Sequence, residues 1–519
     1  MTLAFRVALR AAPALLALAC AADDMTVAPL DATGSTGGFA TGTGGGPAGN
    51  AGKGGTGGTG GKAENGGTSS TGGAAGTSTF GGSAGQPATT GPGGGPGVGG
   101  GGAAGAAGST SFGGMGPTSG KKFCDLPGAG PTKLTVPPGF CVRSFAPPSV
   151  VPEPRTLRIA PNGDVFVGSP ATSTPGGAFG GLGAIVVLPD DDHDGVADTP
   201  VIFAGGVASS GSCKEHDADP TDFTCGHGIA FIDGFLYLTR WNDVRRYPYA
   251  VGDRKAKGVP QLVATLGMED PLDFRFTHTL DRAPNGDVLV SRGRYDSSTC
   301  TAASMGEGAV FRLPVAGGVP TTAHLVGQGF RNPMYVRCHP TSGTCFANEL
   351  SGDGWDGIGG HEKLVVLSDG SNWGYPCCVD KGKPTNGGTD ELCATVATET
   401  VSFPLHDTPF GLDFNRGSFP GPYKNALFVA NHGHVGSPWV GTGVVWYPVD
   451  PATSMPMPLS DPNASPMIFV GGFGAGAGTV NGRATDVAFS PDGRMFVIDD
   501  TSSEVWWVAP VDLESPLGW

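Results

Sequence analysis

The chain has 519 residues, including 92 glycines and 45 prolines, and it carries a formal net charge of −15 at pH 7. A protein so negative is not expected to bind nucleic acid or an anionic membrane surface. Glycine is concentrated before residue 121, so the folded part of the chain is expected in residues 121–519.

Residues 1–20 have the features of a secretory signal. Arg6 and Arg10 precede the apolar run 11–19, which is too short for a permanent membrane helix. The small residues before Cys20 resemble the end of a bacterial lipoprotein signal, in which the cysteine becomes lipidated. An ordinary signal peptide with an incidental Cys20 is the alternative. We therefore expect an exported protein of the periplasm, outer membrane or cell surface, held by an N-terminal lipid.

Residues 21–120 are predicted to be a disordered linker. From Thr33 to Gly120 the sequence is almost entirely Gly, Ala, Ser and Thr, with few apolar side chains to bury. Such a segment cannot offset the entropy lost on ordering. It has no strict three-residue glycine period, which excludes a collagen-like helix. We expect a flexible tether between the lipid anchor and the folded domain.

A turn followed by an apolar strand recurs six times in residues 121–519. In the clearest copies Pro presets φ for the turn, Gly accepts a positive φ, and alternating apolar residues follow. Successive copies leave room for one propeller blade each, which needs about 40 to 50 residues. An all-β, six-bladed β-propeller is therefore predicted, and a β-sandwich with chance repetition is the alternative. The clear copies are 161–167, 284–290 and 491–497, and the weaker ones are 233–238, 340–346 and 424–429.

Cysteine usage agrees with export to an oxidising compartment. Of the 11 cysteines, all but Cys20 lie in the expected folded region, and no Cys-x-x-Cys or Cys/His spacing fits a zinc site. The neighbours Cys377 and Cys378 are expected to bond to different partners, for which Cys300 and Cys393 are the candidates. The short-range pairs expected as disulfides are Cys124–Cys141, Cys213–Cys225 and Cys338–Cys345.

The acidic segment 190–198 resembles the start of a calcium loop. Its carboxylates alternate along the chain before Gly195, and oxygen ligands of this kind converge on a hard cation. The twelfth position is Val201, so the bidentate Glu of an EF-hand is missing. The segment is either a structural calcium site or a solvated acidic loop. The candidate ligands are Asp190, Asp192, Asp194 and Asp198.

Several motifs are spread in a characteristic order over nearly the whole folded region. They are Pro137-Pro138-Gly139-Phe140, Pro154-Arg155, the segment 188–198, His227-Gly228-Ile229-Ala230, and the segments 329–333, 372–376 and 482–487. In this order they resemble the soluble quinoprotein glucose/sorbosone dehydrogenase family. The resemblance implies a propeller that binds pyrroloquinoline quinone (PQQ), with calcium against the quinone. It also implies oxidation of a sugar or a related polyol or aldehyde, with electrons passed to an external acceptor.

The resemblance makes His278 the predicted catalytic base. It lies a few residues before the turn at Pro284, where the family places the histidine that takes the hydroxyl proton. A neutral histidine is suited to this task near pH 7, while the cofactor accepts the hydride. The alternative is a structural histidine bonded to the backbone.

The resemblance also assigns the cofactor contacts. Arg331 and Asn332 match the family's Arg-Asn-Pro, whose two side chains contact the quinone, and a guanidinium suits the carboxylates of PQQ. An ion pair between blades is the alternative for Arg331. Arg483, in the family's late Gly-Arg motif, is expected either to face the central channel or to be structural. The carbonyls of Ser351 and Gly352 align with the family's calcium ligands.

The chain departs from the family in places that raise two rival functions. Arg294 follows Gly293 where many members have Asp, the segment 430–434 differs from the family's His-Gly-Ser, and no convincing lysine matches a late PQQ contact. One rival is a calcium-dependent lactone or ester hydrolase, for which Glu349 with Asn348 is the only hint. The other is a non-catalytic surface-binding propeller, which the long tether and these departures support.

Overall fold

The computed structural model describes residues 121–172, 179–206, 213, 219–267, 278–294, 299–301, 308–315, 323–351, 361–433, 443–457, 467–474 and 481–515. The predicted lipoprotein signal, Cys20 and the predicted linker lie in residues 1–120, outside these ranges. None of the helices in the described part of the chain has the length and hydrophobicity needed to cross a bilayer.

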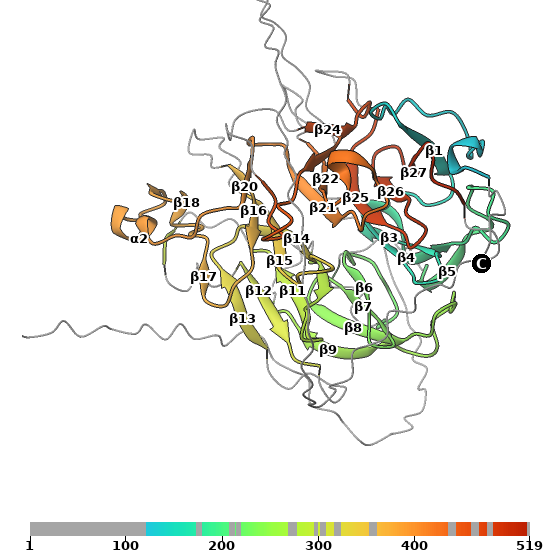
Figure 1. Cartoon of the computed structure of the whole chain (residues 1–519). Coiled ribbons are helices and arrows are strands. Elements are labelled where there is room, and N and C mark those ends of the chain that lie inside the picture. The colour runs from blue at the N-terminus through green and yellow to red at the C-terminus, as the bar shows by residue number, and fades with distance from the viewer. Residues whose placement is uncertain are drawn as a thin grey trace, which may run out of the picture. The chain divides into compact units, whose positions relative to one another are not determined.

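The described residues form the blades of a six-bladed β-propeller, each built on four antiparallel strands (Figure 1). From the centre outwards, the first blade consists of β2 (Thr156–Ile159), β3 (Val165–Thr172), β4 (Phe179–Leu188) and β5 (Val201–Gly205). The second consists of β6 (Ile229–Ile232), β7 (Phe235–Thr239), β8 (Asp243–Pro248) and β9 (Gln261–Thr265). The third consists of β10 (Leu280–Arg282), β11 (Val288–Arg292), β12 (Ala309–Leu313) and β13 (His324–Gln328). The fourth blade consists of β14 (Asn332–Cys338), β15 (Cys345–Leu350), β16 (Glu362–Val366) and β20 (Val401–Phe403). The fifth consists of β21 (Pro409–Phe414), β22 (Leu427–Asn431), β23 (Gly443–Tyr447) and β24 (Met467–Val470). The sixth consists of β25 (Ala484–Phe489), β26 (Met495–Asp499), β27 (Glu504–Pro510) and β1 (Phe140–Ala146).

The last blade joins the two ends of the described chain. Its outermost strand, β1, comes from the N-terminal side and pairs antiparallel with β27, with Val142 opposite Val508. In Figure 1 the blue β1 lies beside the dark red β27. Since the other strands of this blade come from residues 484–510, the pairing closes the ring of blades.

The recurring turns account for the regularity of the blades. Each of the six predicted copies leads into the second strand of a blade, and Gly163, Gly286 and Gly493 adopt positive φ values of 92°, 89° and 94°. Consecutive residues of these strands are buried on both faces: Val165 belongs to the same buried apolar cluster as Trp507, whereas Phe166 packs on Phe231 of the next blade, with ring centres 4.9 Å apart. The cores therefore lie between neighbouring blades. The predicted propeller is confirmed, and the β-sandwich alternative is wrong.

An insertion between β16 and β20 contains β17 (Ser371–Asn372), β18 (Cys378–Asp380), β19 (Lys383–Pro384) and the short helix α2 (Asp390–Ala394). β17 pairs parallel with β13, so the insertion also contacts the preceding blade. Two single-turn helices, η1 (Phe123–Asp125) and η2 (Gly421–Tyr423), lie outside the sheets. The disulfides confirm the three predicted short-range pairs, Cys124–Cys141, Cys213–Cys225 and Cys338–Cys345. They also confirm that Cys377 and Cys378 bond to different partners, and they resolve the pairing that the sequence left open as Cys300–Cys377 and Cys378–Cys393.

Candidate active site

Most of the polar residues predicted for the site lie at the end of the propeller where the six inner strands begin. These strands pack against one another around the propeller axis. Hydrogen bonds join the starts of neighbouring inner strands: Thr485 Oγ1 donates to the Pro154 carbonyl (3.0 Å), and Thr279 Oγ1 donates to the Met334 carbonyl (3.1 Å). Polar residues one or two positions before each strand thus gather at this end. They are Arg155, His227, His278, Arg331, Asp407 and Arg483.

His278, the predicted base, lies two residues before β10 and is fully buried. Its Nε2 is 3.0 Å from the carbonyl oxygen of Trp241, which can only accept, so Nε2 carries the proton. Nδ1 is then left with a lone pair, and no group in the described part of the chain hydrogen-bonds to it. Burial lowers the pKa of His278 to about 4, which keeps the ring neutral at pH 7. The structure thus provides a neutral imidazole with an unshared basic nitrogen.

Arg331 lies at the centre of a buried group on the fourth blade. Its backbone N–H donates to Glu349 Oε1 (2.7 Å), and its Nη1 donates to the Ser351 carbonyl (2.8 Å). The Ser351 N–H donates to Glu362 Oε2 (2.8 Å). Burial raises the pKa of Glu349 to about 7 and that of Glu362 to about 8. Neither glutamate carries a sequence motif of its own, and β-strand pairing alone brings them to Arg331 and Ser351.

Lys363 is a second cation in this group. Its Nζ donates to the Val379 carbonyl (2.8 Å), lies 3.2 Å from Asp380, and is 3.4 Å from Ser351 Oγ. The insertion supplies Val379 and Asp380, so Lys363 fixes the insertion to the site. The sequence offered no lysine motif here, because the partner residues come from the folded insertion.

A further predicted cofactor contact, Asn332, lies close to this group, and so does Arg294. Asn332 is buried, with Nδ2 3.6 Å from the sulfur of Met334. Arg294, one of the departures from the family, donates its backbone N–H to the Arg331 carbonyl (3.0 Å) and holds its guanidinium 5.4 Å from the centre of the Tyr375 ring. Arg294 therefore adds positive charge beside Arg331. Gly352, a predicted calcium ligand, and His434 of the segment 430–434 lie outside the described residues.

Arg483 lies at the same end, two blades away from Arg331, because it precedes β25 of the last blade whereas Arg331 precedes β14 of the fourth. Its Nε donates to the His432 carbonyl (2.9 Å), and its Nη2 donates to the Gly433 carbonyl. The His432 ring stacks on Phe410, with ring centres 4.2 Å apart. Burial lowers the pKa of Arg483 to about 10, which still leaves it charged at pH 7.

Asp500 connects three blades, and no sequence motif marked it. It pairs with Arg155 of the first blade and accepts from His432 Nε2 of the fifth (2.9 Å). Burial works to raise the pKa of Asp500, but His432 and Arg155 outweigh it and hold the pKa well below its usual range. An ionised carboxylate only accepts, so His432 Nε2 donates. The only sequence signal was the Asp499-Asp500 pair at the end of the last repeat strand.

The described residues fit an anionic quinone and a hard cation. Arginine guanidinium groups surround the strand starts and suit carboxylates. The buried Glu349 Oε2 accepts no hydrogen bond from the residues that the structure describes, and a carboxylate oxygen is a ligand that calcium prefers. The Ser351 carbonyl, a predicted calcium ligand, accepts from Arg331, so calcium would compete with that guanidinium for it. The arginines are Arg155, Arg294, Arg331 and Arg483.

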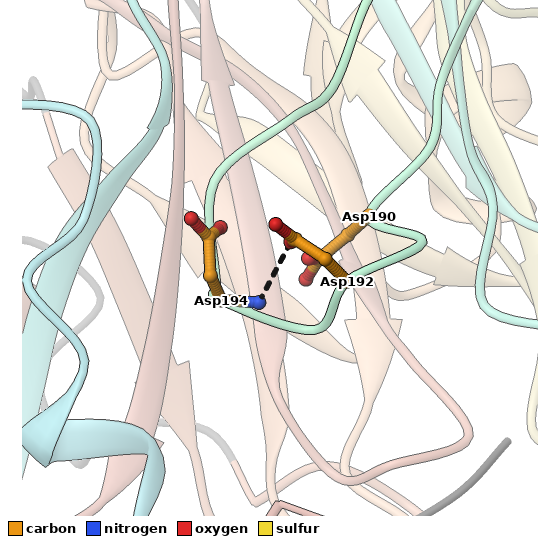
Figure 2. A group of neighbouring side chains, drawn as sticks. All are labelled: Asp190, Asp192 and Asp194. Atoms are coloured by element: carbon orange, nitrogen blue, oxygen red, sulfur yellow. Dashed lines mark hydrogen bonds between the residues drawn. The ribbon is translucent and has the colours of Figure 1, made fainter.

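The predicted calcium loop lies at the other end of the first blade. It follows β4, whose last residue, Leu188, pairs with Val165 at the end of the sheet remote from the strand starts. Figure 2 shows the side chains of Asp190, Asp192 and Asp194 on this one loop, and each offers a carboxylate oxygen within 4.8 Å of the others. Asp198 instead accepts from the Asp191 N–H (2.7 Å). A calcium ion at this loop remains a prediction.

Comparison with solved structures supports the fold. The calcium structure of the family AA12 carbohydrate-active enzyme from Trichoderma reesei has a TM-score of 0.56 at 17% identity, covering 73% of this chain and 97% of that one. The holo form of the pyranose dehydrogenase PQQ domain from Coprinopsis cinerea has a TM-score of 0.54 at 19% identity, covering 72% and 97%. No protein-family model and no curated protein matches the chain. The expected likeness to PQQ-dependent sugar dehydrogenases is confirmed at the level of the fold.

Replacing Glu362 with Gln should stabilise the protein increasingly as pH rises. The folded-state pKa of Glu362, about 8, exceeds the unfolded value. The protonated carboxyl therefore contributes its full share to the free energy of unfolding below about pH 4.5, and this contribution is lost as the pH rises to about 8. Gln mimics the protonated acid. The variant-minus-wild-type free energy of unfolding should increase by about 1 to 3 kcal/mol from pH 5 to pH 9. Denaturant unfolding at both pH values measures it, with Glu399→Gln as control. A difference independent of pH would contradict the assignment.

Calcium should stabilise the protein partly through the acidic loop. At about 10 mM, binding to a site with an affinity typical of extracellular modules adds about 1 to 3 kcal/mol to the free energy of unfolding. Asp192→Asn should remove part of this calcium-dependent gain. Asp191→Asn is the matched control, because Asp191 in the same loop bonds Arg254 through both oxygens. Equal calcium effects in wild type and Asp192→Asn would refute the loop as a site.

Proposed function

We propose that the chain is a PQQ-dependent dehydrogenase that oxidises a sugar or a related polyol or aldehyde and passes the electrons to an external acceptor. The observation that carries the proposal is the neutral, buried His278, whose Nδ1 has no partner, at the arginine-rich end of a propeller with this fold. The bound quinone would supply a two-electron acceptor for the hydride of the substrate. The residues of this chain would bind the two ligands and handle the proton.

His278 would take the proton of the substrate hydroxyl on Nδ1. Its Nε2–H remains bonded to the Trp241 carbonyl, which fixes both the ring orientation and the tautomer. Protonation would create a buried imidazolium, which burial and Arg292 disfavour. The ring therefore gives up this proton readily once the substrate has lost its hydride.

The arginines would bind and orient the cofactor. Arg331 and Asn332 lie at the start of β14, and Arg483 lies at the start of β25. Both guanidinium groups are already anchored to backbone carbonyls, Arg331 to Ser351 and Arg483 to His432. Anchoring before binding reduces the entropy lost when a charged ligand is held. Calcium beside Ser351 would add a further positive charge near the quinone oxygens.

The hydrolase alternative loses its only sequence hint. Asn348 and Glu349 are consecutive in β15, so their side chains project to opposite faces of the sheet. Asn348 Nδ2 donates to the Phe410 carbonyl of the fifth blade (2.6 Å), whereas Glu349 accepts from the backbone of Arg331. The two side chains therefore cannot share one metal ion.

His278→Gln tests the base. We expect kcat for sugar-dependent dye reduction to fall about 100- to 10,000-fold, the usual contribution of a general base. The dissociation constant of PQQ, followed by quinone absorbance in calcium, should change little. His339→Gln is the control, because His339 is also buried but follows the far end of β14. PQQ binding without any sugar-dependent turnover in wild type would favour a binding propeller, and no PQQ binding at tens of micromolar would refute the quinoprotein proposal.

A further inference from the structure

His227 is a buried histidine with neither ring nitrogen bonded. It lies two residues before β6, its side chain is almost fully buried, and neither Nδ1 nor Nε2 has a hydrogen-bond partner among the described residues. The other buried histidines differ: His278 and His432 each bond a partner through Nε2, and His339 Nδ1 accepts from two backbone N–H groups. Leaving a buried polar group unpaired destabilises the folded protein.

The unpaired imidazole lies beside the proposed base. Its ring contacts the edge of Tyr335, with centres 5.4 Å apart, and Tyr335 donates its hydroxyl to the Arg155 carbonyl. The next residue, Gly228, touches His278: a Cβ added at Gly228 would lie 2.9 Å from the His278 carbonyl oxygen. His227 therefore lies where the starts of β6 and β10 meet.

The chemistry of a neutral imidazole restricts what it can bind. Burial lowers the pKa of His227 well below its ordinary value, and the positive charge of Arg155 adds to this effect. A neutral ring offers one donor and one acceptor. Carboxylates and quinone carbonyls only accept, so they can satisfy one nitrogen alone. Hydroxyl groups both donate and accept, so neighbouring hydroxyls can satisfy both.

We propose that His227 binds the sugar substrate, through a second hydroxyl of the molecule whose first hydroxyl gives its proton to His278. This inference rests on the proposed function. It makes His227 a specificity-determining residue, because a substrate lacking that hydroxyl leaves the imidazole unpaired. It also implies that the ligand-free protein is less stable than it could be, because the unpaired imidazole is retained for binding and not for folding.

The unfolding temperature of the ligand-free protein distinguishes this role of His227 from a structural one. His227→Leu removes the two unpaired nitrogens while keeping an apolar side chain in the site. If His227 serves binding, the ligand-free variant should unfold at the same temperature as wild type or higher. If His227 serves folding through an internal water, the variant should unfold at a lower temperature.

The experiment uses the full chain with PQQ, calcium and a dye acceptor. The probes are D-glucose, 2-deoxy-D-glucose and 3-deoxy-D-glucose, and the variants are His227→Leu, His227→Gln and, as control, His339→Gln. For His227→Leu we expect KM for D-glucose to rise about 10- to 100-fold, the equivalent of a lost buried hydrogen bond. The dissociation constant of PQQ should stay within about twofold, as for a residue that contacts sugar alone. Wild type should discriminate against one deoxy sugar, and His227→Leu should not.

Each contrary result has a distinct meaning. An unchanged KM together with a lower unfolding temperature would overturn the inference and make His227 structural. A weakened PQQ affinity with unchanged deoxy-sugar discrimination would assign His227 to the cofactor and overturn the sugar role. A wild-type chain that neither binds PQQ nor oxidises any probe would refute the proposed function itself, and the sugar role with it.

Discussion

The pairing of β1 with β27 holds the candidate site together, because it closes the ring on which all six inner strands depend. The site consists of residues at the starts of those strands, and its bonds run between blades. Arg155 and Asp500, which lie on either side of the closure, form an ion pair across 345 positions of sequence. Opening the ring would separate them, and His432 would lose its acceptor.

Burial then determines the charge of each group at this end. His227 and His278 are neutral because burial disfavours their protonated forms, and Glu349 and Glu362 have raised pKa values for the corresponding reason. Asp500 stays ionised because the charge of Arg155 and the hydrogen bond from His432 outweigh burial. The site thus combines fixed cations with neutral imidazoles. An oxidation that removes a proton and a hydride needs this combination, since a cationic histidine could not act as a base.

The sequence predicted the fold well because the propeller is built from a repeated local signal. Each turn-strand copy became the second strand of a blade, and cysteine spacing identified the three short-range disulfides but not which of Cys300 and Cys393 bonds to Cys377. Only part of the site followed, because Glu349, Lys363 and Asp500 acquire their meaning from partners on other strands or blades. Arg155 lies in the Pro154-Arg155 motif, but no residue pattern near it in the sequence links it to Asp500. Whether the ring nitrogens of His227 find hydrogen-bond partners depends on the residues that surround the imidazole in the folded propeller. Residue spacing in the sequence does not predict this.

A crystal structure of the chain with PQQ and calcium would show whether the starts of the inner strands bind the quinone. We expect quinone density over these strand starts, with its carboxylates against Arg331 and Arg483 and its reactive face toward the side of His278. Density at another surface, or none under conditions in which the propeller is folded, would contradict this expectation. The fold would then have to be explained by a different ligand.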